Sequence, residues 1–198
     1  MSASRFASVV LTLLLVAEAA SGGAVAPSDW PRFRGPNGQG VAPDDARPPS
    51  QFGTDKNLAW ATELPPGHSS PVVAEGRIFL TACHEKKLET ICLDAATGNI
   101  LWRRPAPSDK IEDVNSSNSP AASTPVTDGE RVYVYFGSFG LVAYDQGGAE
   151  LWKVPVPTPQ NLFGTGTSPI VVAGNVVLVR DSDAVDSSVF AVDRKTGK

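Results

Sequence analysis

The chain has 198 residues and a formal net charge of −4, and its isoelectric point is near 5.2. This acidic balance argues against nucleic acid or an anionic membrane surface as the main partner. The 18 glycines and 17 prolines are spread along the chain, which is typical of many turns between short strands rather than of a low-complexity segment.

The N-terminus is predicted to be a secretory signal peptide, residues 1–19. A short segment with Arg5 precedes an apolar run that ends at Val16, and small residues surround Ala19. The run is too short for a membrane span, so we expect cleavage after Ala19 and no transmembrane span in the mature chain. No cysteine lies near the cleavage position, and a lipid anchor is therefore not indicated. The predicted location is the periplasm or the outside of a bacterial cell.

Residues 20–57 are expected to form an irregular lead-in segment. The part from Pro27 to Asn57 has no regular apolar period, and it contains the proline-rich sequence RPPS at Arg47–Ser50. Such a composition is typical of a connection that runs over a protein surface.

A hairpin is predicted where the sequence reads LDAATGNILW, Leu93–Trp102. Two runs with β-propensity flank a turn in which Gly98 supplies a positive φ, and the side chains of Asp94 and Thr97 can bind backbone amides. Trp102 leaves this turn on the outgoing strand with a large apolar surface, which one hairpin cannot cover alone.

The same pattern recurs twice, with the aspartates about 50 residues apart. The second copy contains Asp145, Gly148 and Trp152, and the third contains Asp193, Thr196 and Gly197. A Ser/Thr-Pro-Val/Ile step opens a β-rich run before each hairpin, at Ser69, Ser123 and Thr167. The earlier run NLAW, Asn57–Trp60, is interpreted as the last strand of a unit whose beginning is missing or lies elsewhere in a circle of units.

A period near 50 residues with about four short strands is typical of a β-propeller blade. Helical repeats need a 3.6-residue period, which is absent after the N-terminus, and a sandwich with similar hairpins does not explain the proline step, the turn and the tryptophan together. We therefore predict an all-β fold, a β-propeller of four-stranded blades over residues 58–198. About three repeats are present and the last is incomplete, so we expect a truncated chain.

The sequence DAATGNILW and its weaker copies resemble the repeat of the pyrroloquinoline-quinone-like (PQQ-like) propellers. This superfamily includes the quinoprotein alcohol dehydrogenases and the bacterial outer-membrane assembly lipoprotein, and the resemblance covers about Trp60–Lys198. The segment DWPRFRGPNGQGV, Asp29–Val41, is similar to a secreted branch of the superfamily. The resemblance implies that Trp60, Trp102 and Trp152 dock between neighbouring blades.

Cys83 and Cys92 flank the sequence HEKKLETI in a predicted hairpin. A turn centred near Lys87 and Leu88 would place the two cysteines opposite each other. A cross-strand disulfide is then one interpretation in an oxidising compartment. Two small buried side chains on neighbouring strands are the alternative.

Three further patterns suggest chemistry only weakly. The carboxylates of DSDAVDSS, Asp181–Ser188, could bind calcium, but the glycine and glutamate of an EF-hand loop are absent, and a solvated loop is expected. The sequence GTGTS, Gly164–Ser168, precedes a strand rather than a helix, so it is not interpreted as a phosphate cradle. His68 and His84 lack the spacing of metal ligands.

Two functional hypotheses follow. The catalytic dehydrogenases of the superfamily use an adjacent pair of cysteines, a calcium ion and an aspartate base, and this sequence contains no Cys-Cys pair. We therefore assign no catalytic, cofactor or metal residue and favour a secreted, non-catalytic scaffold that binds a protein or a cell-envelope polymer. The alternative is part of a quinone-dependent dehydrogenase, with PQQ and calcium, whose active-site residues lie mostly beyond residue 198.

Overall fold

The computed structural model describes residues 29–183 and 187–198. These residues form strands, turns and irregular segments. The predicted signal peptide, residues 1–19, lies outside them, as does the first part of the lead-in segment. Within the described ranges no helix has the length and apolar character that a membrane crossing requires.

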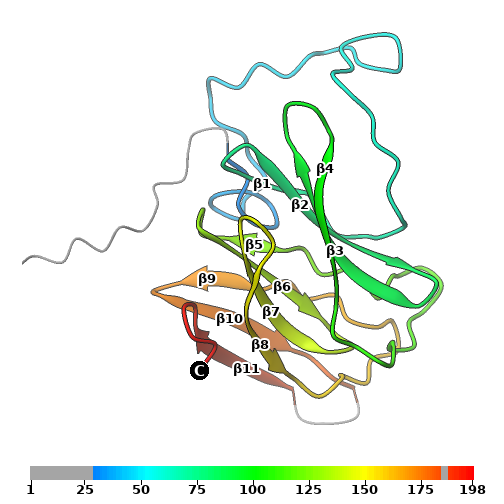
Figure 1. Ribbon diagram of the computed structural model, residues 1–198, viewed down its shortest axis with the longest axis vertical. Coiled ribbons are helices and arrows are strands. Elements are labelled where there is room, and N and C mark those ends of the chain that lie inside the picture. Colours follow the sequence, from blue (N-terminus) through cyan, green and yellow to red (C-terminus); the bar gives the residue numbers. More distant parts are fainter. Residues whose placement is uncertain (1–28, 184–186) are drawn as a thin grey trace, which may run out of the picture.

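The strands of the described residues form three antiparallel sheets, in which strands next to each other in sequence pair (Figure 1). The first sheet contains β1 (Val72–Ala74), β2 (Arg77–His84), β3 (Lys87–Asp94) and β4 (Ile100–Pro105). The second contains β5 (Val126–Thr127), β6 (Arg131–Phe136), β7 (Gly140–Asp145) and β8 (Glu150–Pro155). The third contains β9 (Ile170–Val172), β10 (Asn175–Arg180) and β11 (Ser188–Asp193). The prediction of an all-β, partial propeller is confirmed, with two four-stranded blades and one three-stranded blade.

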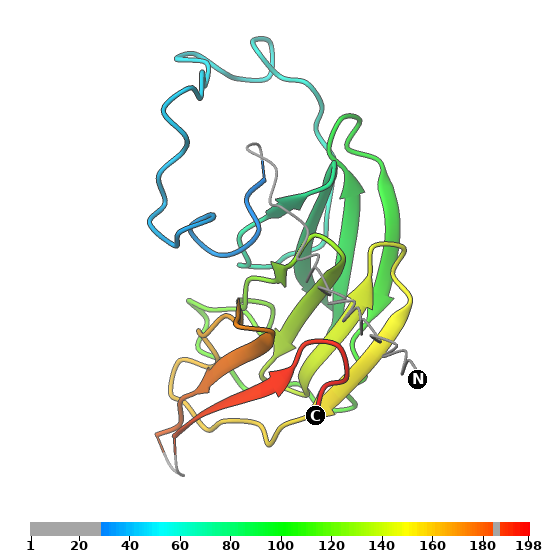
Figure 2. The same cartoon turned by 90° about the vertical axis from the view of Figure 1, so that its left-hand side faces the viewer.

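The three blades lie one after another, and the second is enclosed by the other two (Figure 2). This position explains why β6 is buried along nearly its whole length. Its alternate residues Val132 and Val134 pack toward the first blade, while Tyr133 and Tyr135 pack toward the third. A strand that is covered on both faces must be apolar on both, so β6 reads as a continuous run rather than an alternating pattern.

The Asp-containing turn of each sheet receives a tryptophan that precedes that sheet in the sequence. The indole Nε1 of Trp102 donates to the backbone oxygen of Gln146 at 3.0 Å, and the ring lies directly on Gly148. A Cβ atom added to Gly148 would lie 2.7 Å from the Trp102 ring. Only glycine, which also holds a φ of +81° here, allows this approach.

The same contact repeats at the other two turns. Trp60 Nε1 donates to the Ala95 oxygen at 3.0 Å, and Trp152 Nε1 donates to the Arg194 oxygen at 3.0 Å. Their rings lie on Gly98 and Gly197 respectively. The contact is therefore a property of the repeat and not of one pair of blades.

The turns that receive these rings are built by their own side chains. Asp94 Oδ1 accepts hydrogen bonds from the backbone amide and the hydroxyl of Thr97, both at 2.8 Å. Asp193 and Thr196 repeat this arrangement at 2.8 and 2.9 Å. These bonds lower the pKa of both aspartates, because a carboxylate that accepts several hydrogen bonds is favoured in its charged form.

One strand prediction is wrong. The run NLAW, Asn57–Trp60, is not a strand in the structure, although Trp60 reaches the first blade as its counterparts do. The lead-in segment before it is irregular, and Trp30 pairs with Val73 at the edge of β1 in an isolated bridge. Trp60 therefore contacts the turn of the first blade from an irregular segment and not from the outer strand of a blade.

Replacing Trp102 by Ala is expected to lower the free energy of unfolding by about 3–5 kcal/mol, because a large buried ring is lost from a tightly packed blade contact. Chemical denaturation measures this change. Leu101 is the matched control, since it precedes Trp102 on β4 and is 47% exposed. A Leu101→Ala effect as large as that of Trp102→Ala would contradict the docking role.

Candidate functional site

One end of the three blades carries the long connections between them. Each sheet is a meander, so the β2–β3 and β6–β7 turns lie at the same end as the β4–β5 connection, residues 106–125, and the β8–β9 connection, residues 156–169. We call this the connection end, and it lies toward the lower right of Figure 1. The opposite end carries the Asp-containing turns that receive the tryptophans. Long connections on a rigid scaffold are where binding residues commonly lie.

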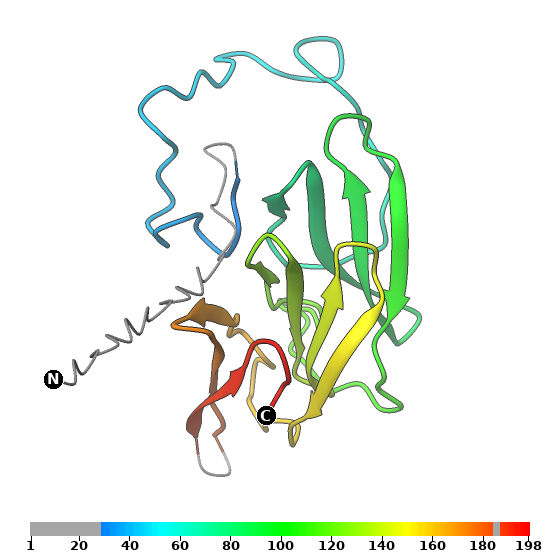
Figure 3. The same ribbon diagram turned by 60° about the vertical axis from the view of Figure 1, so that its left-hand side comes forward.

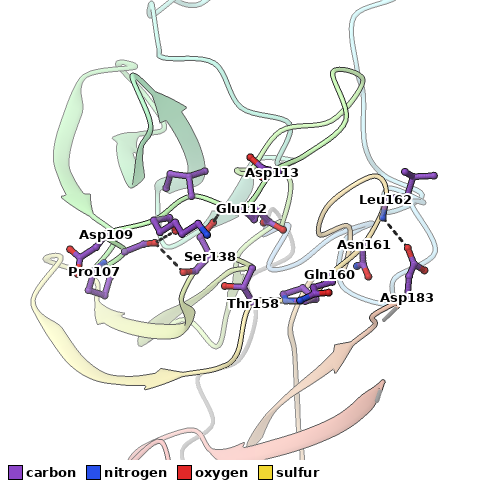
Figure 4. A pocket seen from close by; sticks show the side chains of 14 residues that line it. Pro107, Asp109, Glu112, Asp113, Ser138, Thr158, Gln160, Asn161, Leu162 and Asp183 are labelled. Carbon is purple, nitrogen blue, oxygen red and sulfur yellow. Dashed lines mark hydrogen bonds between the residues drawn. The ribbon is translucent and has the colours of Figure 1, made fainter. Parts of the chain in front are cut away.

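A pocket of about 750 Å³ opens between the two long connections. Figure 4 shows Glu112 and Asp113 on one wall, and Asn161, Leu162 and Asp183 on the other. Five of the lining residues are charged, and four of these are acidic: Asp109, Lys110, Glu112, Asp113 and Asp183. The pocket therefore presents a predominantly negative surface.

Hydrogen bonds hold the walls of this pocket to the blades. The hydroxyl of Ser108 donates to the Ser138 backbone oxygen at 3.0 Å, and the Glu112 amide donates to the Ser138 hydroxyl at 3.0 Å. On the other wall the Leu162 amide donates to Asp183 Oδ2 at 2.9 Å. The connections are therefore fixed to the turns of the second and third blades rather than free in solvent.

Glu112 joins the two connections beneath the pocket. Its Oε2 accepts hydrogen bonds from the Thr165 hydroxyl at 2.9 Å and from the Thr165 amide at 3.3 Å. Its Oε1 is buried and has no hydrogen-bond partner among the described residues. A Cβ on Gly137 would overlap both Glu112 Oε1 and Thr165 Oγ1, so glycine in the β6–β7 turn makes the room. Burial raises the pKa of Glu112 and outweighs the hydrogen bonds from Thr165.

Two large apolar side chains are exposed beside the pocket, Leu162 in its lining and Phe163 next in sequence. Leu162 is 74% exposed and Phe163 is 59% exposed. Their backbone is nevertheless held in place, because Asn118 donates to the Phe163 oxygen at 2.9 Å and the Gly164 amide donates to the Asn161 oxygen at 3.2 Å. The two neighbouring side chains offer an apolar contact area beside the charged pocket.

The weak sequence patterns are placed in or near this end. Within GTGTS, Gly164 has a φ of +85° and packs on Val114, and Thr165 binds Glu112. In the described part of the acidic loop, Asp181 accepts from the Ser187 hydroxyl at 2.8 Å and the Asp183 carboxylate accepts from the Leu162 amide, while Asp186 lies outside the described residues. Among the residues that the structure covers, no group of three His, Cys, Asp or Glu side chains could hold a metal ion. His84 lies beside Glu85, at 3.8 Å.

The predicted register of the cysteine hairpin is wrong. Cys83 pairs with Leu88, and Cys92 pairs with Phe79, so the two cysteines are offset by four residues, about 13 Å along the strand. A disulfide requires Cα atoms within about 7 Å, and both thiols are free. The cause is a two-residue turn at Glu85 and Lys86, whose φ values of 49° and 60° are those of a tight hairpin.

Sequence reasoning did not identify Glu112 or Leu162. Glu112 stands in the sequence KIEDV, which matches no binding motif. In the sequence, only its position in a long connection between repeats distinguishes it from carboxylates that are exposed. The apolar pair of Leu162 and Phe163 interrupts a polar connection, and that interruption was a usable signal.

Comparisons with known proteins agree on the fold. A family model described as outer membrane protein assembly factor BamB matches residues 51–198, about three quarters of the chain. No curated protein sequence matches. A quinohemoprotein alcohol dehydrogenase from Pseudomonas putida HK5 superposes with a TM-score of 0.63 at 24% identity, covering 87% of this chain and 26% of that one. The quinohemoprotein alcohol dehydrogenase from Comamonas testosteroni gives 0.59 at 21%, covering 90% and 27%.

These identities establish a shared propeller fold and no more. The chain spans about a quarter of the length of the dehydrogenases that it superposes on. The described residues do not fit a quinone and calcium centre of the kind that the resemblance implies for the catalytic enzymes. The two cysteines are neither adjacent nor bonded, and the acidic side chains do not gather as a cage.

Unfolding the protein without reductant is expected to expose two titratable thiols per chain. In the native protein Cys92 should not react at about pH 8, because burial raises the pKa of its thiol to about 12 and removes the reactive thiolate. A thiol-specific dye measures both states. Fewer than two thiols after unfolding would show that the cysteines are oxidised.

Glu112→Gln is expected to change how stability depends on pH. The folded state raises the pKa of Glu112 above its ordinary value of 4.5, so it favours the protonated carboxyl group. This preference stabilises the folded protein at low pH, and the stabilisation is lost as the pH rises through the raised pKa. The wild type should therefore become less stable relative to Glu112→Gln as the pH rises above the ordinary glutamate pKa of 4.5, as urea denaturation measures.

The matched control is Glu63→Gln, because Glu63 is exposed. This variant makes the same chemical change at an exposed carboxyl group and so reports the effect of the substitution without burial. If the stability difference between the wild type and Glu112→Gln did not change with pH, the raised pKa of a buried Glu112 carboxyl group would be contradicted.

Proposed function

Because the chain belongs to the family of outer membrane protein assembly factor BamB, we propose that it is a non-catalytic β-propeller scaffold. In this proposal the connection end binds a protein partner in the cell envelope. The name of the family refers to the assembly of outer membrane proteins, and a protein of that process is the partner class that we favour. The chain would act in the periplasm or outside the cell, as its predicted signal peptide also indicates.

One observation carries the proposal: the fixed apolar pair of Leu162 and Phe163. Large apolar side chains that are more than half exposed lose contact with water when a partner covers them, and this gain is largest at the centre of an interface. Their backbone is already held by Asn118 and Asp183, so little conformational entropy is lost on binding.

The surroundings of the pair suit a protein partner. The acidic pocket next to Leu162 supplies a polar and charged border, and interfaces commonly surround a small apolar centre with a polar rim. Acidic groups at a rim raise the association rate of a partner with a basic surface more than they raise its affinity. A segment with an apolar side chain close to a Lys or Arg fits this chemistry best.

The alternative, a quinone-dependent dehydrogenase, receives less support. Its motivation is the propeller fold, which hosts many unrelated functions. The described residues offer neither adjacent cysteines nor a set of calcium ligands, so no step of such a reaction can be derived from them.

A photo-crosslinking amino acid at Leu162 or Phe163 is expected to give a defined product with one envelope protein, identified by mass spectrometry. Replacing Leu162 by Asp while the crosslinker stands at position 163 should lower the yield about tenfold or more, because a charge then faces an apolar contact. The experiment uses cells that produce the full protein.

Leu151 is the matched control position. It is an exposed leucine, at 45%, near the start of the outer strand β8 and so away from the connection end. Equal crosslinking from Leu151, or none from Leu162 and Phe163, would contradict a partner site at this end. Reduction of an electron acceptor by an alcohol in the presence of PQQ and Ca²⁺ would contradict the non-catalytic assignment.

A further inference from the structure

A second pocket lies between the lead-in segment and the starts of all three blades. Its volume is about 410 Å³. The lead-in contributes Arg32 and Phe33, and each blade contributes the residues just before its first strand. Figure 3 shows the lead-in passing beside β1 and β5, with β9 next to them. The pocket is distinct from the acidic pocket of the connection end.

The lead-in is attached to the blades where it forms this pocket. Trp30 and Val73 exchange two backbone hydrogen bonds of 2.8 and 3.0 Å, and the Thr127 amide donates to the Pro31 oxygen at 2.9 Å. The following chain folds back in a turn, in which the Gly35 amide donates to the Arg32 oxygen at 2.9 Å. The ring of Trp30 lies on Gly35, where a Cβ atom would approach it to 2.8 Å. Arg32 is therefore held between two anchored residues.

The guanidinium group of Arg32 retains donors that the fold does not use. Its Nε donates to the Gly35 oxygen at 3.2 Å, and its Nη2 donates to the Pro36 oxygen at 2.7 Å. A guanidinium carries five N–H donors, so three remain. These two carbonyls also fix the plane of the group, and no aspartate or glutamate is among the described residues that line the pocket.

Three hydroxyl groups from equivalent positions of the three blades face the same pocket. Ser70, Thr124 and Ser168 each precede the proline that opens a blade, and all three line the cavity. The Ser70 amide donates to Thr124 Oγ1 and the Thr124 amide donates to Ser168 Oγ, both at 3.0 Å. These bonds use the hydroxyl oxygens as acceptors.

The protons of these hydroxyls remain available. None of the three hydroxyls donates a hydrogen bond to another described residue, although Thr124 is only 2% exposed. A buried donor without an acceptor is costly, and an acceptor in the pocket would satisfy it. The pocket thus combines unused hydroxyl and guanidinium donors with no carboxylate to compete for them.

We propose that this pocket binds the oxyanion group, carboxylate or phosphate, of a small ligand. Guanidinium and hydroxyl groups are the donors that recognise such anions through charge-assisted hydrogen bonds. Phe33 and Ile170 also line the pocket and are 52% and 41% exposed, so the rest of the ligand is apolar or aromatic. The chain as a whole has a net charge of −4, so the donors of this pocket would attract an anion in spite of the overall negative charge.

Titration calorimetry with the full chain tests the proposal with three probes of similar size. Phenyl phosphate and benzoate carry the two oxyanions, and benzyl alcohol carries the same ring without a charge. Both anions should give saturable binding, and benzyl alcohol should bind at least tenfold more weakly. The tighter of the two anions distinguishes a phosphate ligand from a carboxylate ligand. Equal binding of benzyl alcohol, or no saturable anion binding by the folded protein, would overturn the proposal.

Two substitutions locate the site. Arg32→Gln should weaken anion binding about tenfold or more, since a charged donor is lost. Arg34→Gln is the matched control, because Arg34 is an exposed neighbour that does not line the pocket. Equal losses in the two variants would overturn the assignment to Arg32.

The Ser70→Ala variant tests anion binding with a substitution that is not expected to disturb the fold. The Ser70 hydroxyl makes no hydrogen bond to a described residue, so its removal should leave the unfolding midpoint unchanged while it weakens anion binding several-fold. Backbone amide shifts of Ser70 and Thr124 in NMR spectra should move on addition of phenyl phosphate. Unchanged affinity in Ser70→Ala together with unmoved amide shifts would place the anion elsewhere.

Discussion

The contact between a tryptophan ring and the glycine turn of the next unit is the constraint on which the architecture depends. The ring can reach the backbone only because the turn residue has no Cβ atom, and the indole N–H is satisfied by a carbonyl of the same turn. The turn is rigid in its own right, since Asp94 and its counterpart Asp193 bind their own backbone amides. Local hairpin chemistry therefore decides how neighbouring blades are placed, and no blade completes its packing alone.

The second blade shows the consequence of this arrangement. Its central strands are apolar on both faces because a neighbouring blade covers each of them, whereas Val172 and Val189 of the third sheet are 50% and 69% exposed. A polar link adds to the apolar contacts at the end that carries the Asp-containing turns. There Asp128 of the second blade accepts hydrogen bonds from the Tyr133 hydroxyl at 2.8 Å and from Arg194 of the third blade at 2.9 Å. Apolar and polar contacts thus act together where the second and third blades meet.

The repeat made the fold predictable, and features that do not repeat were the ones that sequence reasoning missed. Three copies of a turn and a tryptophan predict one architecture, because each copy supports the interpretation of the others. The β2–β3 register depended instead on one turn, formed by Glu85 and Lys86 at positive φ, where the usual Asn-Gly signal is absent. Glu112 was unpredictable for a different reason: its burial comes from Thr165, 53 residues away, and from the room that Gly137 leaves.

The same distinction separates structural residues from candidate functional ones. Residues that recur in every unit serve blade packing, while Glu112, Leu162 and Phe163 each occur once, in connections that differ between repeats. The row of hydroxyls at Ser70, Thr124 and Ser168 is repeated, and repetition alone would make it another element of blade contact. Arg32 gives this row a second role, because the lead-in places its guanidinium group on one side of the three equivalent hydroxyl donors. A symmetric structural feature becomes an asymmetric binding pocket when one residue from outside the repeat is added to it.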